Sequence, residues 1–150
     1  MNTEQQLDID LPCNVLAEQV VLGCLIEDSK LLPGIVATGL EHDEFILSDH
    51  QRVFQAILDL HQRGSPIDYV SVAEQLGNAS DDFALLGSLI HGVVVERSHA
   101  LHQAKIVRRK AGLRAILKIS EWMGGAAADT SADPELLIHL AIEKLQGVRL

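Results

Sequence analysis

The chain has 150 residues, of which 47% are hydrophobic and only 3% aromatic, and its formal net charge is −9. A chain of this length can bury a core of Leu, Ile, Val and Ala without disulfide or metal support, and its two cysteines form no metal-binding or redox motif. Since it contains no run of 18 apolar residues and no secretory signal, we expect a cytoplasmic protein that does not enter a membrane.

Acidic and basic side chains are unevenly distributed along the chain. Residues 1–97 carry 16 acidic and 4 basic side chains, whereas residues 98–123 carry 6 basic and 1 acidic. An acidic body repels phosphate backbones. Any contact with nucleic acid would therefore have to come from the basic middle block.

The N-terminal part is predicted to begin with a tail, followed by two helices. Residues 1–10 are polar and acidic, and we expect them to be disordered or extended. A first helix should begin after Pro12, with Asn14 as its N-cap, and run through VLAEQVVLGCLIE. A short helix within residues 28–40 should follow, with Pro33 in its first turn.

The most regular helical pattern lies in residues 48–63. Ser48 and Gln51 have the spacing of a capping box, and the apolar residues after them recur at helical spacing. Gly64 is placed to end this helix in the left-handed conformation.

Two further helical segments complete a predicted head domain, residues 11–97. Asp68 or Ser71 should cap a short helix that ends at Gly77. Residues 83–95 are predicted to form one more helix or two half-helices.

Residues 98–150 are predicted to form a helical hairpin. Residues 98–123 contain no proline and would span about 39 Å as one helix. The stretch GGAAADTSA then predicts a turn, and Asp133 followed by Pro134 predicts the start of a last helix over PELLIHLAIEKLQ. Because no segment alternates with the period of a β-strand, we expect an all-α fold in which a compact multi-helix head is followed by a C-terminal helical hairpin.

Positive charge is most concentrated in the stretch KIVRRKAGLRAILKIS, residues 105–120. At about 100° per residue, its six cations fall on two nearly opposite edges of the helix. A helix that reads DNA directs its cations into one groove, so these residues are interpreted mainly as solvated edges. The alternative is a DNA-binding module that acts through residues 105–118. The candidates for an anionic contact are Arg108, Arg109 and Arg114.

Apolar residues form separate stripes between these charged edges, and the returning helix is apolar around more than half of its circumference. A helix with separated apolar stripes must be covered from more than one side. The simplest cover is a second copy of the hairpin in a four-helix arrangement, and the alternative is that residues 1–97 cover it. The candidates for hairpin packing and self-association are Ile106, Val107, Leu113, Leu117, Leu137, Leu140 and Leu145.

No catalytic motif is present in the sequence. It contains no glycine-rich phosphate loop, no dinucleotide-binding fingerprint and no nucleophile elbow. His99 and His102 could share one face of a helix, but no further ligand accompanies them. We therefore predict no catalytic, cofactor-binding or metal-binding residues.

Three blocks of the sequence resemble the replicative DnaB-type DNA helicases. The first is LPCNVLAEQVVLGCLI, residues 11–26, with its Pro, its Ala-Glu-Gln and its Leu-Gly followed by Leu. The second, residues 45–76, is similar over its whole length and includes a Gly-x-Pro-Ile-Asp element at Gly64. The third, AKIVRRKAGLRAIL, is similar to the start of that family's helical hairpin.

This resemblance implies the helical N-terminal domain of such a helicase. In that family the domain forms paired hairpins within a hexameric ring and contacts primase, so we expect a homo-oligomer, from a dimer up to a hexamer, with DNA contacted at most indirectly. The ATPase motor, with its ATP and magnesium, is a separate domain of RecA type that we expect to be absent here. The chain would then be a non-catalytic oligomerisation and interaction domain in DNA replication. An adaptor without any helicase connection is the remaining alternative.

Overall fold

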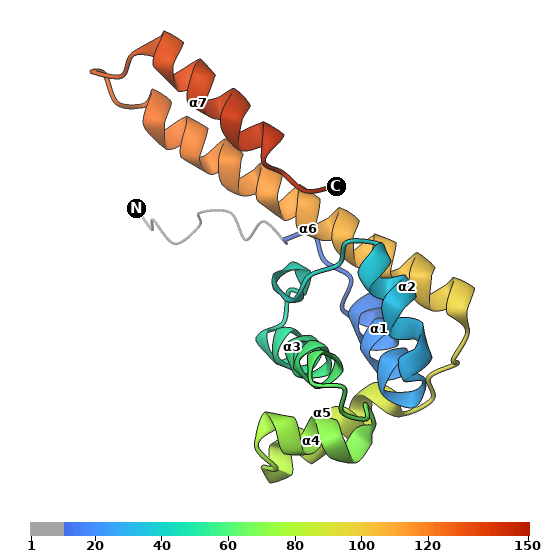
Figure 1. Ribbon diagram of the computed structural model, residues 1–150. Helices are drawn as coiled ribbons and strands as arrows, with labels where there is room; N and C mark the ends of the chain where they lie inside the picture. The colour runs from blue at the N-terminus through green and yellow to red at the C-terminus, as the bar shows by residue number, and fades with distance from the viewer. Residues whose placement is uncertain (1–10) are drawn as a thin grey trace. The chain divides into compact units, whose positions relative to one another are not determined.

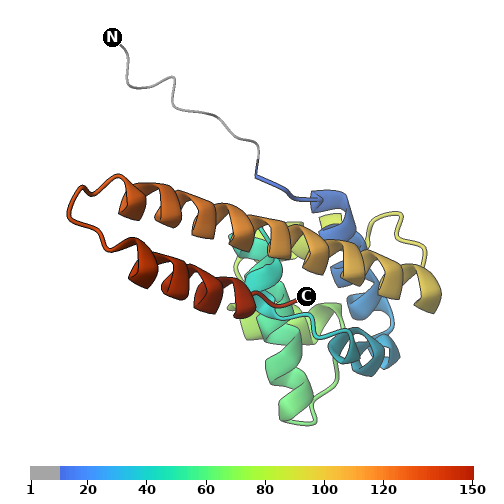
Figure 2. The same ribbon diagram turned by 90° about the horizontal axis from the view of Figure 1, so that it is seen from above.

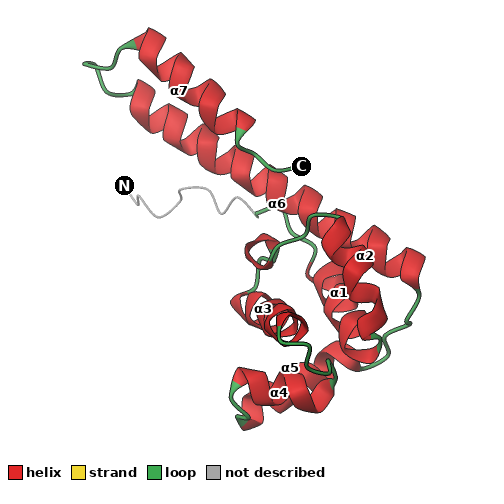
Figure 3. Cartoon of the chain, in the orientation of Figure 1, coloured by secondary structure: helices red, strands yellow, loops and turns green. Residues whose placement is uncertain are grey.

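A computed structural model of the chain describes residues 11–150, so the predicted tail of residues 1–10 lies outside the described residues. Every regular element in this part of the chain is a helix, which confirms the all-α prediction (Figure 3). The chain divides into two compact units. The head unit comprises residues 14–111, and the hairpin unit comprises residues 112–150 together with the described residues 11–13.

The long helix α6, Arg97–Ala127, contributes residues to both units. Ala104 and Val107 on its first half are buried in the core of the head unit. The sequence places the boundary between head and hairpin at residues 97 and 98. The structure instead groups α6 with the head as far as Ala111, because this stripe of small side chains packs there.

Helix α1, Val15–Glu27, is the most deeply buried element of the head unit. The Ala17 N–H donates a hydrogen bond of 2.9 Å to the Asn14 side chain, which confirms the predicted N-cap. The helix is apolar on nearly all sides because α3 and α5 both pack against it. At Gly23 the approach of α5 is so close that an added Cβ would lie 2.2 Å from the Leu89 carbonyl oxygen.

The other head elements surround α1 and share its core. They are η1 (Ser29–Leu31), α2 (Leu32–Ala37), η2 (His42–Glu44), α3 (Ser48–Gln62), α4 (Tyr69–Leu76) and α5 (Ser80–Ile90). Helix α3 contacts α1, η2 and α4, and α4 contacts α5 (Figure 1). The rings of Phe45 and Phe54 meet in the core with their centroids 5.1 Å apart.

The ends of α3 and α4 test the predicted caps. The predicted capping box at Ser48 is wrong, because the N-cap is Leu47 and the Gln51 amide instead donates to the Phe45 carbonyl at 2.7 Å. Gly64 ends α3 with φ of 68°, as predicted. Asp68 caps α4, and the hydrogen bond from the Ser71 N–H lowers the pKa of its carboxyl group.

The hairpin unit pairs the second half of α6 with α7, Pro134–Gln146, and the two helices run antiparallel side by side (Figures 1 and 2). Asp133 begins α7 by accepting a 3.0 Å hydrogen bond from the Glu135 N–H, as predicted. The predicted turn starts later than expected, because α6 continues through Gly124 and Gly125 to Ala127.

Candidate interaction surfaces

The seam between α6 and α7 includes one small side chain, Ala141, and two long ones, Trp122 and Lys144. Ala141 is the one buried residue of α7, and Trp122 on α6 is half-buried. The Lys144 ammonium lies 4.7 Å from the centroid of the Trp122 ring, a distance suited to a cation–π contact. Gly112 is buried under the end of the chain, where an added Cβ would lie 3.5 Å from the Leu150 side chain.

Large apolar side chains remain exposed on the hairpin unit outside this seam. On α6 they are Leu113, Ile116 and Met123, and on α7 they are Leu136, Ile138, Leu140, Ile142 and Leu145. At about 100° per residue, the α7 set falls on two flanks, with Leu136 and Leu140 on one and the other three residues on the opposite one. The described hairpin therefore leaves apolar surface that its own two helices do not cover.

The predicted self-association residues fall into three groups according to their exposure and the unit to which they belong. Leu113, Leu140 and Leu145 are exposed on the hairpin unit, at 41%, 36% and 45%. Leu117 and Leu137 are half-buried within the same unit. The other two predicted residues do not belong to this surface, because Val107 is 1% exposed in the core of the head unit and Ile106 packs against that core.

The predicted anionic-contact residues do not converge on one surface. Arg108 is held inside the head unit, where its Nε lies 3.3 Å from the Glu44 carboxylate and its other end donates to the Thr38 carbonyl oxygen. Arg114 donates to the Pro12 carbonyl at 2.8 Å in the hairpin unit. Arg109 is exposed. Two of the three arginines are thus engaged in contacts within the chain.

A buried ionisable pair joins α1 to α3, and sequence reasoning missed it. The Glu18 carboxylate accepts a 2.9 Å hydrogen bond from the Ile46 N–H and lies 2.8 Å from the Nδ1 atom of His50. Both side chains are at most 3% exposed. A glutamate amid the apolar run of α1 was the available signal, because a buried carboxylate requires a partner.

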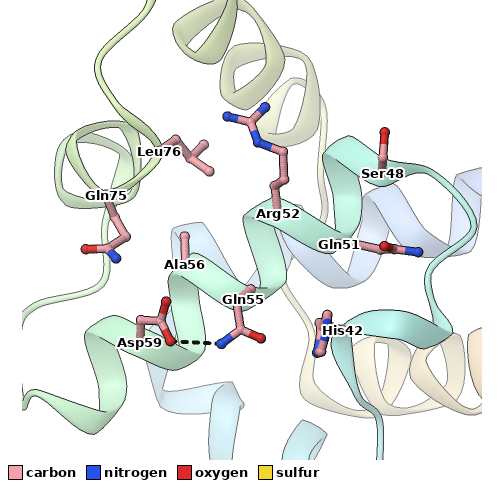
Figure 4. A pocket seen from close by; sticks show the side chains of 9 residues that line it. All are labelled: His42, Ser48, Gln51, Arg52, Gln55, Ala56, Asp59, Gln75 and Leu76. Atoms are coloured by element: carbon pink, nitrogen blue, oxygen red, sulfur yellow. Dashed lines mark hydrogen bonds between the residues drawn. The ribbon is translucent and has the colours of Figure 1, made fainter.

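A pocket of about 430 Å³, most of whose lining residues have polar side chains, lies on the outward side of α3. Six residues of α3 line it, together with His42 of η2 and with Gln75 and Leu76 of α4. Figure 4 shows α3 running through the middle, with His42 beside Gln51 and Gln55 and with Leu76 facing Ala56. No sequence pattern indicates this pocket, because only the packing of α4 beside α3 brings its residues together.

Arg52 forms one side of this pocket and is neutralised by two carboxylates. Its guanidinium lies 3.2 Å from Asp49 and 3.2 Å from the buried Asp82. The hydrogen bonds that the guanidinium donates, first to Asp82 and then to Asp49, raise the pKa of Arg52 above its ordinary value. Arg52 therefore serves to anchor the start of α5 to α3.

Among residues 11–150, no three His, Cys, Asp or Glu side chains lie close enough together to hold a metal ion. His99 and His102 are both exposed on α6. No helix within the same residues has the length and apolar content needed to cross a bilayer.

The observed features define an all-α domain made of a helical head and a helical hairpin. The sequence profile of the DnaB-like helicase N terminal domain matches residues 10–109, which is two thirds of the chain. The chain belongs to this family.

Known proteins agree with this assignment in sequence and in structure. The chain is 32% identical over 112 residues to the replicative DNA helicase DnaC of Bacillus subtilis, which covers 71% of the chain and 24% of that protein. It is 30% identical to the replicative DNA helicase DnaB of Buchnera aphidicola, over 98% of the chain and 33% of that protein. The chain thus spans between a quarter and a third of the length of these relatives. The crystal structure of the N-terminal domain of DnaB helicase from Mycobacterium tuberculosis superposes with a TM-score of 0.81 at 28% identity, covering 91% of this chain and 99% of that one.

Proposed function

We propose that this chain is the non-catalytic oligomerisation and protein-interaction domain of a replicative DNA helicase and that it acts in DNA replication in the cytoplasm. Family membership supports the replication context, because the relatives that match are replicative helicases. Unwinding and the use of ATP and magnesium would belong to a motor domain outside this chain. The remaining alternative of an unrelated adaptor is not compatible with the family assignment.

Self-association through the hairpin unit is supported by its exposed apolar surface. Eight large apolar residues of α6 and α7 are at least 36% exposed, and two antiparallel helices cannot bury them all. Exposed apolar surface that is contiguous along an element is typical of an interface between protein chains. A second hairpin placed against it would form a four-helix bundle.

Substitution on each flank of α7 tests this proposal. Leu140→Glu and Leu145→Glu lie on opposite flanks, and Leu47→Glu on the head unit is a matched control because Leu47 is 41% exposed. By sedimentation velocity at tens of micromolar, we expect the native chain and the control to form dimers or larger assemblies. At least one hairpin variant should sediment as a monomer. A monomeric native chain, or assembly unchanged by both hairpin variants, would contradict the proposal.

Contact with primase is the finer part of the proposal and follows from the resemblance alone. It is tested by adding the primase of the same organism to the chain and following its sedimentation. A complex is expected, and the absence of one at tens of micromolar would remove this part of the proposal. The DNA-binding alternative gains no support, because Arg108 and Arg114 are both engaged within the chain.

A further inference from the structure

We propose that the pocket on the outward side of α3 binds a cationic side chain, an arginine or a lysine, of a partner protein. This inference does not depend on pairing of the hairpins or on recognition of primase. It follows from which polar atoms of the pocket are already hydrogen-bonded and which are left over.

The donors of the two central glutamines are used within the chain. The Gln51 amide nitrogen donates to the Phe45 carbonyl oxygen, and the Gln55 amide nitrogen donates to Asp59 at 2.8 Å. Because both partners are acceptors, these bonds fix which end of each amide carries the nitrogen. The two Oε1 atoms are left as acceptors with no hydrogen bond from any described residue.

These acceptors lie in a row along one side of α3. Gln51, Gln55 and Asp59 follow each other at four-residue intervals, which places them on one face of a helix. Asp59 adds a negative charge and a second carboxylate oxygen that does not take part in the bond from Gln55. The row therefore presents three oxygen acceptors and one formal negative charge to solvent.

The rest of the pocket suits the stem of a long cationic side chain. The half-buried Leu76 of α4 supplies apolar surface next to the buried Ala56, as Figure 4 shows. Arginine and lysine pack their methylene stems on apolar surface and direct only the charged head to acceptors. The guanidinium of arginine, with five donors in a planar fork, can reach more than one of the three oxygens.

The surrounding charge favours a cation from a distance. Residues 41–82, which include all of the pocket, carry nine acidic and two basic side chains, for a net charge of −7. Arg52, the basic residue in the lining, is already paired with Asp49 and Asp82. Arg63, the other basic residue of this range, donates to the lining residue Gln75 at 2.6 Å. The range as a whole still carries an excess of negative charge, which favours basic segments, more strongly at low salt.

The test uses the whole 150-residue chain and a short basic peptide. Acetyl-Ala-Arg-Ala-amide would be titrated into the ¹⁵N-labelled chain at low salt, with the uncharged citrulline peptide as the matched ligand. We expect shifts confined to the backbone amides of residues 51–59 and 75–76, with saturation in the millimolar range. Shifts that spread over the acidic surface, or equal shifts with citrulline, would overturn the proposal.

Variants that remove one negative charge distinguish binding in this pocket from general attraction to an acidic surface. Asp59→Asn should weaken binding of the arginine peptide by about fivefold or more, since it removes a charge-assisted contact. Glu74→Gln removes the same charge from an exposed residue outside the lining and should change binding by less than about twofold. Equal weakening by the two variants would contradict a specific pocket.

A gain-of-binding variant covers the case in which Asp59→Asn is poorly folded. Ser48→Glu, at the exposed first residue of α3, adds a second carboxylate to the lining without removing a hydrogen bond of the row and should tighten binding of the arginine peptide. No tightening in a variant with native circular dichroism would count against the proposal. Spermidine that produces the same shifts at lower concentration than the peptide would overturn the assignment to a protein partner.

Discussion

Gly23 shows how one atom can determine the packing of two helices. The backbone of α5 approaches α1 so closely that there is room for hydrogen but not for carbon, with 2.2 Å between the added Cβ and the Leu89 carbonyl oxygen. Because the obstacle is backbone rather than a flexible side chain, α5 itself would have to move. The preference of helices for alanine over glycine is too small, at about 1 kcal/mol, to offset that shift.

We predict that Gly23→Ala lowers the free energy of unfolding by about 1–3 kcal/mol, the usual cost of overpacking a core. Gly87→Ala is the matched control, since Gly87 is also within a helix and an added Cβ there meets no atom within 4 Å. The control should be neutral or stabilising by up to about 1 kcal/mol. Urea denaturation of both variants measures the difference, and similar stabilities would contradict the close approach.

The Glu18 carboxylate is the second residue on which the head unit depends. It accepts a hydrogen bond from the backbone N–H of the partly buried Ile46 and contacts the imidazole of His50, which is buried. We predict that Glu18→Ala destabilises the chain by about 3 kcal/mol, since it leaves buried polar groups without partners.

Glu27→Ala provides the comparison for Glu18, because Glu27 is exposed at the end of the same helix. Its effect on the unfolding free energy should stay within about 0.5 kcal/mol. Thermal or urea unfolding followed by circular dichroism would reveal the difference. Equal losses for the two variants would show that the buried carboxylate does not have the role assigned to it.

At the scale of elements, Arg108 fixes the first half of α6 to the head unit. Its guanidinium reaches the nearly buried Glu44 and the Thr38 carbonyl, and it lies close to Gly39, whose φ is 85°. An added Cβ at Gly39 would come within 3.0 Å of the guanidinium. The glycine therefore provides both the turn and the space that Arg108 occupies.

We predict that Arg108→Gln lowers the free energy of unfolding by about 2–4 kcal/mol, because it removes the cation that lies 3.3 Å from the nearly buried Glu44 carboxylate. Arg109→Gln removes the same charge from the exposed neighbour and should change stability by less than about 0.5 kcal/mol. The measurement is chemical denaturation of the two variants side by side. A small effect at Arg108 would mean that α6 is held by apolar packing alone.

Element boundaries were predictable where the sequence carries a local signal. Asp133 before Pro134 marked the start of α7, and Gly64 and Gly77 marked two helix ends, because each of these residues has a strong conformational preference of its own. The end of α6 was not predictable in this way. Two glycines favour a turn by propensity, yet the helix continues through them, with the Ala128 N–H donating to the Gly124 carbonyl at 3.1 Å.

For the molecule as a whole, the fold class and the family could be predicted from the sequence, whereas the interaction surfaces could not. Helical spacing and the three similar blocks predicted an all-α head with a hairpin. The division of α6 between two units depends on where along the helix, after Val107, side chains stop packing into the head core. Helical spacing does not specify that position. The α3 pocket brings residues 42 and 76 to one place, so only the tertiary structure reveals it.

The contact between Glu18 and His50 also limits how this chain can change over evolutionary time. Loss of Glu18 leaves the buried His50 without this partner, and loss of His50 leaves the buried Glu18 carboxylate with the Ile46 N–H alone, whereas an apolar pair of similar volume at both positions can be tolerated. A lineage that abandons this hydrogen-bonded pair must therefore pass through a less stable single variant or acquire both substitutions together. Positions 18 and 50 should thus covary, because the residue at one position determines which residues are acceptable at the other.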